Sequence, residues 1–245
     1  MNLSPAISKT ERDGEAAERR WPVVPVEEGY ARWAPTYDQT PNPLLAVEER
    51  YLTPMLPEMR GLRILDLACG TARWTRMLAS KGIALGVGTD LSAEMLAVAQ
   101  KHIGQSSPLI RANCLNLPLQ DSSFDLVICS FALEHVPCVD QFSNEVSRIL
   151  RNSGHVFLTQ LHPSAYLTGW RNGFRDNRGH TQIDSMPHTA ERIVHSFQRR
   201  EFEAKEALEG FIGEPEIPIF VSAGKEQLFR DVCQTPAILL LHLVR

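Results

Sequence analysis

Short apolar runs alternate with longer amphipathic stretches from residue 61 to the end of the chain. Seven runs rich in aliphatic and β-branched residues predict strands over residues 63–68, 83–90, 108–112, 124–130, 155–161, 202–209 and 237–244. Apolar residues at helical spacing predict a helix from Thr71 to Ser80, with Thr71 as its cap, and others from Ser92, over 140–150 and over about 190–197. Residues 168–187 are polar and glycine-rich and predict a loop.

This alternation predicts the fold class. Strands separated by helix-length connections pair in parallel, because only such a connection returns the chain to the same edge of a sheet. We therefore expect an α/β protein with a Rossmann-like, doubly wound, mostly parallel seven-stranded sheet and helices on both faces.

Composition and charge limit the classes of partner that the protein is expected to bind. A net charge of −4 over 245 residues provides no broad basic surface for nucleic-acid phosphates. The five cysteines are odd in number and form no CxxC pair, which favours a reducing cytoplasm and predicts no metal site. No run approaches the ~18 apolar residues of a membrane helix. We expect a cytoplasmic monomer or homodimer without nucleic-acid or membrane partners.

A glycine turn and an acidic residue indicate a ligand. The segment from Leu65 to Arg73, LDLACGTAR, places small residues where a predicted strand turns into a helix, so that the backbone can approach a ligand. Asp90 ends the next predicted strand twenty positions after Gly70. At an offset of about 20 residues, an acidic side chain accepts hydrogen bonds from ribose hydroxyls. The two features together predict an adenosine-type ligand.

The same turn bears on which adenosine compound binds. It lacks the G-x-G-x-x-G pattern with which nicotinamide dehydrogenases approach a diphosphate, and bulky Arg73 and Trp74 follow it at once. This favours an adenosine that carries an amino-acid tail. A nucleotide-dependent oxidoreductase is the less favoured alternative.

Residues 61–162 resemble the class I S-adenosylmethionine-dependent methyltransferases, especially the small-molecule group that includes the ubiquinone and menaquinone biosynthesis enzymes. The first motif of that family, an acidic residue followed by a small-x-Gly-x-small turn, is matched by Asp66, Ala68, Gly70 and Ala72. The resemblance implies S-adenosylmethionine as the cofactor, with Asp66 helping to hold its methionine amino group directly or through water.

Three further motifs of the family are matched in order. The resemblance places Asp90 on the ribose, Leu91 beside the adenine, and the segment Asn113, Cys114 and Leu115 around the base. Asn113 replaces the usual Asp, and its amide oxygen can still accept from the adenine amine. Ser130 ends the fourth motif. The residues that follow it, FALEHV, differ from the Asn/Asp-Pro-Pro-aromatic motif of family members that methylate nucleic-acid amines.

Aromatic residues flank the predicted core on both sides. Tyr37 and Asp38 resemble the lid in which an aromatic residue covers the methionine end of the cofactor; alternatively, Tyr30, Trp33 and Tyr37 anchor the first helices to the core. The predicted acceptor-binding residues are Trp33, His135, Tyr166 and Trp170. They suit an apolar or aromatic acceptor.

Candidate acid–base residues are His162, after the fifth predicted strand, and His188, before a helix. Each also fits a capping role, and His135 fits a pocket wall better than a base. Methyl transfer requires alignment and exclusion of water and can proceed without a dedicated base.

The sequence thus predicts an enzyme, an S-adenosylmethionine-dependent methyltransferase that modifies oxygen or carbon of a small-molecule acceptor. A non-catalytic homologue that keeps the cofactor pocket is the alternative. Residues 1–29 are predicted to be a disordered extension, and 30–245 a single methyltransferase domain. Within it, 30–60 would form a helical lid, 61–162 the cofactor-binding core, and 163–245 the substrate loop and the end of the sheet.

Overall fold

The computed structural model describes residues 21–245. Of the predicted extension, residues 1–20 lie outside that range. Residues 21–29 are not an irregular tail but form β1 (Val23–Val24) and the start of α1 (Val26–Trp33). The local sequence gave no sign of this, because the partners of β1 are Gln182 and Ile183, far along the chain.

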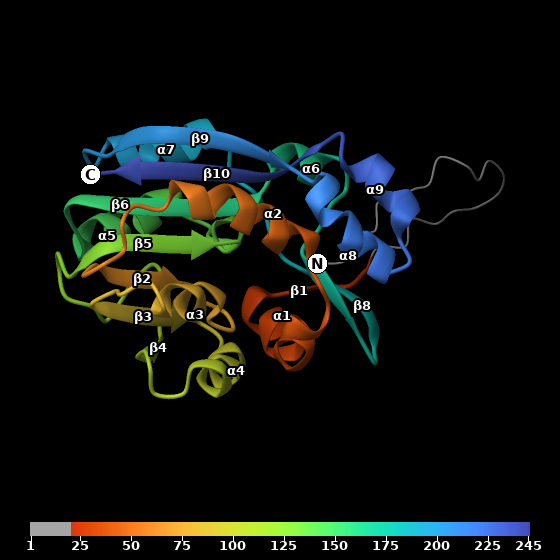
Figure 1. Ribbon diagram of the computed structural model, residues 1–245, viewed down its shortest axis with the longest axis horizontal. Coiled ribbons are helices and arrows are strands. Elements are labelled where there is room, and N and C mark those ends of the chain that lie inside the picture. The colour runs from red at the N-terminus through yellow and green to blue at the C-terminus, as the bar shows by residue number, and fades with distance from the viewer. Residues whose placement is uncertain (1–20) are drawn as a thin grey trace.

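The main sheet is a seven-stranded, mostly parallel layer within the described residues, as predicted (Figure 1). Its order is β4 (Leu109–Arg111), β3 (Leu85–Asp90), β2 (Arg63–Leu67), β5 (Phe124–Ser130), β6 (Leu150–Leu161), β10 (Pro236–Val244) and β9 (Glu203–Phe211). Strand β10 runs antiparallel to both of its neighbours, and the other neighbouring pairs are parallel. The carboxyl ends of β2, β3 and β5 therefore meet along one edge.

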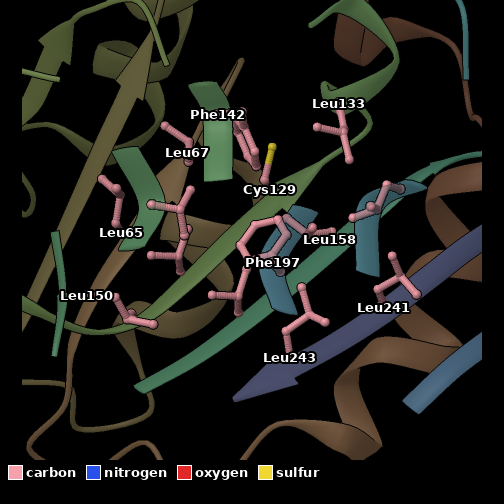
Figure 2. Close-up of a cluster of buried hydrophobic side chains, with 14 of the residues drawn as sticks. Leu65, Leu67, Cys129, Leu133, Phe142, Leu150, Leu158, Phe197, Leu241 and Leu243 are labelled. Atoms are coloured by element: carbon pink, nitrogen blue, oxygen red, sulfur yellow. The ribbon is translucent and has the colours of Figure 1, made fainter. Parts of the chain in front are cut away.

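Apolar residues that alternate along the strands build a core on each face of the sheet. On one face, Leu65 and Leu67 of β2 contribute to a cluster with Phe142 of α5 (Val139–Ile149) and Phe197 of α7 (Ala190–Gln198) (Figure 2). On the other face, Ile64 joins a cluster formed with α2 (Pro43–Leu52) and α3 (Arg73–Ala79). Helix α4 (Ala93–Ile103) packs beside β3 and β4. Full burial of each large side chain stabilises the fold by roughly 1.5–3 kcal/mol.

A second, three-stranded sheet lies beyond the carboxyl ends of the main strands (Figure 1). The predicted loop over 168–187 is wrong, because β7 (Gly173–Asp176) and β8 (Gly179–Ile183) form a hairpin there, preceded by α6 (Pro163–Leu167). Strand β1 adds to β8 in parallel, and buried Gly29 brings α1 against Ile183. The N-terminal segment and the hairpin thus form one cap over the sheet.

Several short helices complete the structure. They are the 3-10 helices η1 (Ala34–Gln39), η2 (Thr53–Met55), η3 (Leu133–His135) and η4 (Glu214–Glu216), and the α-helices α8 (Ile217–Ser222) and α9 (Glu226–Val232). Helices η1 and η2 lie within the predicted helical segment 30–60, and the others were not predicted from the sequence. Within residues 21–245 no helix has the length and apolar character needed to span a bilayer. The same residues contain no group of three or more metal-binding side chains.

Candidate cofactor and acceptor site

The loop between β2 and α3 has an unusual backbone. Ala68, Gly70 and Ala72 all lie in the left-handed region, with φ of 57°, 55° and 65°. For the two alanines such a conformation costs on the order of 1–3 kcal/mol and persists only where surrounding contacts impose it. Hydrogen bonds from the Cys69 amide to the Thr89 carbonyl and from the Ala72 amide to the Cys69 carbonyl, both 2.8 Å, hold the loop in place.

This backbone corrects the predicted helix cap. Helix α3 begins at Arg73 and has Ala72 at its N-cap, without a side-chain cap. The Thr71 hydroxyl instead donates to Asp38 Oδ1 at 2.9 Å. Ala72 does not reach the neighbouring cavities but is fully buried against Ala99 and Ile103.

Asp90, at the end of β3, ties this loop to the next one. Its Oδ2 accepts from the Gly70 amide and its Oδ1 from the Ser92 amide, each at 2.8 Å. Burial is the largest effect on the pKa of Asp90 and raises it, while the backbone hydrogen bonds act in the opposite direction. The carboxylate therefore lies in a site with little water, where hydroxyl donors of a ligand would bind it strongly.

A cavity of about 270 Å³ opens where the strand ends and the cap meet. It is lined by residues from four strand ends, α1, η1, α4 and the segment after β5: Val26, Tyr30, Tyr37, Ala68, Gly70, Asp90, Leu91, Met95, Asn113, Cys114, Leu115, Ser130, Phe131, Ala132, His135, Val136 and Pro137. Nine of the eleven cofactor-binding candidates, and His135, line this cavity. Most of its other walls are apolar.

The remaining polar groups of the cavity have defined surroundings. Asn113 Oδ1 accepts a hydrogen bond from the Leu115 amide at 2.9 Å, which shapes the turn after β4. This bond uses one of the two lone pairs of the oxygen that was predicted to accept from the adenine amine. Burial raises the pKa of the Cys114 thiol to about 11, so this thiol is neutral. Phe131, just after β5, has a φ of 50°, a second strained position at the same edge.

A smaller cavity of about 50 Å³ adjoins the first and shares Tyr37, Ala68, Gly70 and Ser130 with it. Asp66 lines this cavity. Its Oδ2 accepts from both the amide and the hydroxyl of Thr75 at 2.8 Å, and burial raises its pKa to about 6. Asp66 is thus firmly positioned by α3 and faces the space next to the glycine turn.

Arg73 also lines the smaller cavity and forms a buried ion pair. It donates to Glu48, which is fully buried and also accepts from the Thr159 hydroxyl and from Trp74 Nε1. Arg73 Nη2 is 3.3 Å from Ser130 Oγ, whereas its Nη1 is buried without a hydrogen-bond partner among residues 21–245. Burial lowers the pKa of Arg73 to about 10, so the guanidinium remains charged. An unpaired donor beside this cavity fits an anionic group of a ligand.

The N-terminal aromatic residues have two different roles. Tyr37 lines both cavities, and burial raises its pKa to about 12. Trp33 lines neither. It stacks on Phe174 of β7 with centroids 5.5 Å apart and lies 4.8 Å from the Tyr37 ring, so it anchors the cap.

Tyr166 and Trp170, predicted to bind the acceptor, lie in a different apolar cluster. That cluster contains Leu44 of α2 and Phe220 of α8, and neither aromatic residue lines the two cavities. The Arg171 guanidinium covers the Tyr166 ring at 3.8 Å. The hairpin missed in the sequence draws this segment away from the cavity.

The two candidate catalytic histidines also lie outside the cavity linings. His162 Nδ1 accepts from the Ser164 amide at 3.1 Å and caps α6, while its Nε2 is 3.3 Å from Glu209 Oε1. Burial is the main influence on the pKa of His162 and lowers it. His188 Nε2 lies 2.9 Å from the Val136 carbonyl, and its backbone bonds to Gln160. Both histidines thus have structural partners.

Sequence reasoning missed a polar contact across the cavity. The Tyr30 hydroxyl lies 2.9 Å from His135 Nε2, although the two residues are 105 positions apart. Met95 and Phe131 were also missed as lining residues. The aromatic Tyr30 and the segment FALEHV were visible signals, but no local pattern shows that they meet.

Known proteins resemble this chain in sequence and in fold. Residues 65–158 match a family model described as a methyltransferase domain. A 159-residue segment is 31% identical to the demethylmenaquinone methyltransferase of Listeria welshimeri, covering 61% of this chain and 67% of that protein. A 129-residue segment is 34% identical to the demethylmenaquinone methyltransferase of Lactiplantibacillus plantarum and spans 48% of this chain but only 54% of that protein.

A solved structure extends the likeness beyond the matched segment. The crystal structure of an S-adenosylmethionine dependent methyltransferase from Mesorhizobium loti superposes with a TM-score of 0.67 at 25% identity. The match covers 83% of this chain and 100% of that one. The likeness therefore extends over much more of this chain than residues 65–158.

Proposed function

Since this chain belongs to the class I S-adenosylmethionine-dependent methyltransferases, we propose that its two adjoining cavities hold S-adenosylmethionine and that it methylates a small-molecule acceptor. The observation that carries the proposal is the partly buried Asp90 carboxylate, which is bonded to the left-handed Gly70 turn at the edge of the larger cavity. This arrangement matches the acidic ribose ligand that follows the first strand–turn–helix of nucleotide-binding α/β folds.

The residues present fit each part of the cofactor. Asp90 would accept from the ribose hydroxyls, and Leu91, Asn113 and Leu115 would surround the base. The unpaired Nη1 of Arg73 suits the methionine carboxylate, and Asp66 suits the ammonium group. When bound, S-adenosylmethionine supplies a methyl group whose bond to sulfur breaks, with the electron pair staying on sulfur, as the acceptor forms its new bond. The protein aligns the acceptor and excludes water.

The remaining walls of the larger cavity indicate the kind of acceptor. Val26, Phe131, Val136 and Pro137 are apolar, and the polar groups among them are Tyr30 and His135. Such a surface favours an apolar or aromatic molecule with an oxygen or carbon nucleophile over a charged one. The relatives named demethylmenaquinone methyltransferase support this class of acceptor.

The net charge and the free cysteines support a proposal about the partners and the compartment of the protein. The net charge of −4 supports an enzyme that works without a nucleic-acid partner. All five cysteines are free, which supports a reducing compartment such as the cytoplasm. We propose a monomer or homodimer that acts away from membranes.

Comparing two ligands tests how the cofactor is held. S-Adenosylhomocysteine carries the amino-acid tail, and 5′-methylthioadenosine lacks it. Arg73→Met should weaken binding of S-adenosylhomocysteine about tenfold or more, as expected for a lost charged hydrogen bond, and leave 5′-methylthioadenosine unaffected. Equal losses for both ligands would remove Arg73 from the tail site.

A labelling experiment tests the activity itself. The protein is incubated with S-adenosylmethionine labelled on its methyl group and a small-molecule extract of the organism that encodes it, and the products are separated by mass. A labelled small molecule is expected. Binding of S-adenosylhomocysteine without any labelled product would instead support the non-catalytic alternative.

A further inference from the structure

A chain of hydrogen bonds runs from the larger cavity to the loop before α7. The Tyr30 hydroxyl, on α1, lies 2.9 Å from His135 Nε2, on η3. The other ring nitrogen of His135, Nδ1, lies 2.7 Å from the backbone carbonyl of Asp184. Tyr30 and His135 both line the cavity, and their rings meet edge to face at 5.3 Å.

These contacts fix the protonation of the imidazole. A carbonyl oxygen can only accept, so His135 Nδ1 carries a hydrogen, and in the tautomer with this single N–H the acceptor nitrogen is Nε2. The Tyr30 hydroxyl therefore donates to Nε2, and Asn172 Nδ2 approaches the same nitrogen at 3.4 Å. The hydroxyl oxygen of Tyr30 keeps its own lone pairs for a donor in the cavity.

Buried and acidic groups surround the Tyr30 hydroxyl and its partner His135. Asn172 Nδ2 also donates to Glu134 Oε1 at 3.1 Å, and Glu134 Oε2 is buried with no hydrogen-bond partner in the described part of the chain. Burial raises the pKa of Tyr30 well above its ordinary value, and the nearby charges of Tyr37, Glu134 and Asp90 act in the same direction. The phenol thus stays protonated and is available to donate its proton to His135 Nε2.

We propose that Tyr30 and His135 form a proton relay that ionises the acceptor, and that the acceptor therefore carries a phenolic or enolic hydroxyl. The inference rests on the proposed function and specifies its substrate. The acceptor hydroxyl gives its proton to the Tyr30 oxygen while Tyr30 gives its own proton to His135 Nε2. The acceptor oxygen then forms the bond to the methyl group as the methyl–sulfur bond breaks and its electron pair stays on sulfur. Where a ring carbon activated by that oxygen attacks instead, the carbon afterwards loses its own hydrogen to water as a proton. His135 is partly exposed and returns its proton to water.

The relay distinguishes hydroxyl acceptors from amines. A neutral amine already has a nucleophilic lone pair and needs no base before it attacks. A phenol with a pKa near 10 is almost entirely protonated at neutral pH, so a positioned base accelerates its reaction by about 10²–10⁴-fold. The pair is therefore expected to act only where the acceptor must lose a proton.

Two substitutions remove the proton-transferring groups and keep the packing and the hydrogen bond that hold them in place. Tyr30→Phe deletes the hydroxyl and keeps the ring. His135→Asn places an amide near the position of Nδ1, where it can still donate to Asp184, but has no second nitrogen to act as a base. Matched controls are Tyr166→Phe, whose side chain lines neither cavity, and His195→Gln, on the exposed side of α7.

The test uses the full chain with labelled S-adenosylmethionine and two hydroxylated probes, 1-naphthol and the more acidic 4-nitrophenol, with 1-naphthylamine as the amine counterpart. The parent should methylate 1-naphthol in preference to the amine. Tyr30→Phe and His135→Asn should lower kcat for 1-naphthol by about 100-fold, within the range for acid–base groups, and the loss should be smaller for 4-nitrophenol. The controls should match the parent.

A second readout does not depend on turnover. Absorbance titration of 4-nitrophenol in the presence of S-adenosylhomocysteine should show the bound probe ionising at a lower pH than the free probe, and His135→Asn should abolish this shift. Failure to bind S-adenosylhomocysteine would overturn the proposed function. Three outcomes would overturn the relay alone, each with normal S-adenosylhomocysteine binding. They are no methylation of either hydroxyl probe, a preference of the parent for the amine, and variants whose kcat and probe titration equal those of the parent.

Discussion

The carboxylate of Asp90 accepts a hydrogen bond from the backbone amide of Gly70 at 2.8 Å. This contact joins the turn after β2 to the end of β3, two neighbouring parallel strands whose ends form one edge of the larger cavity. It explains how a loop with three left-handed residues keeps its shape: the loop is fixed by the residue that would also contact the ribose. The shape of this turn is therefore set by contacts within the protein.

The first prediction concerns the buried ion pair. Arg73→Met should lower the free energy of unfolding by about 3–5 kcal/mol, because Glu48 is fully buried and would lose its counter-ion. Adding Glu48→Gln should restore most of that loss, since a neutral amide needs no counter-ion. Urea denaturation of the parent, the two single variants and the double variant measures this. A double variant as unstable as Arg73→Met would contradict the pairing.

The second prediction concerns pH and Asp66. Burial raises the pKa of Asp66 from 3.8 to about 6 in the folded protein, so between these values the folded state holds a proton that the unfolded state has lost. Its contribution to stability is therefore favourable at low pH and declines as the pH rises from about 4 to about 6.

Asp66→Asn removes this dependence. Relative to the parent, the variant should become more stable by up to about 3 kcal/mol as the pH rises through that window, and the difference should stay constant above it. Urea denaturation at a series of pH values measures the difference. Parallel curves for the two proteins would show that Asp66 titrates normally.

The third prediction distinguishes a lid from a structural anchor in the N-terminal segment. Thr71→Val removes the hydroxyl that holds Asp38 at 2.9 Å while preserving the shape of the side chain. If the segment closes over the methionine end of the cofactor, affinity for S-adenosylhomocysteine should fall by about 0.5–1.5 kcal/mol. Fluorescence titration measures the affinity. A loss of thermal stability with unchanged affinity would support the anchor.

The fourth prediction concerns His162, which the sequence presented as a catalytic candidate. Its Nδ1 caps α6, so His162→Ala should lower stability by about 1 kcal/mol, and His162→Asn should retain the cap. Both variants should keep the parent's turnover within about twofold, far from the 10²–10⁴-fold loss expected for an acid–base group. Steady-state kinetics on a methylated probe decides this, and a large loss in His162→Asn would restore the catalytic role.

The main sheet and the cofactor motifs could be predicted because their information is local. The turn from Ala68 to Ala72 and the strand that precedes it lie within a few residues of each other, and Asp90 ends the next strand. Parallel pairing then brings the two strand ends together without any further information. Nine of the eleven cofactor candidates accordingly line the larger cavity.

Apart from His135, the side chains that complete the larger cavity could not be predicted, because they come together through contacts between distant segments. Strand β1 exists only because β8 offers it an edge, and Tyr30 meets His135 only after the cap has formed. Tyr166 and His162 follow a predicted strand, as acceptor-binding residues often do, but α6 and the hairpin after it direct them elsewhere. Residues next to strand ends thus indicate the edge of the sheet where a ligand binds, but they do not show which side chains reach that ligand.

Calorimetric titration of the purified chain with S-adenosylhomocysteine, beside Asp90→Asn, tests the central claim most directly. The parent should bind one equivalent saturably. The variant should bind about 1–3 kcal/mol more weakly, because an amide at this position loses charged hydrogen bonds to the ribose. Absence of saturable binding to the parent, or equal affinity in the two proteins, would contradict the assignment of this cavity to the cofactor.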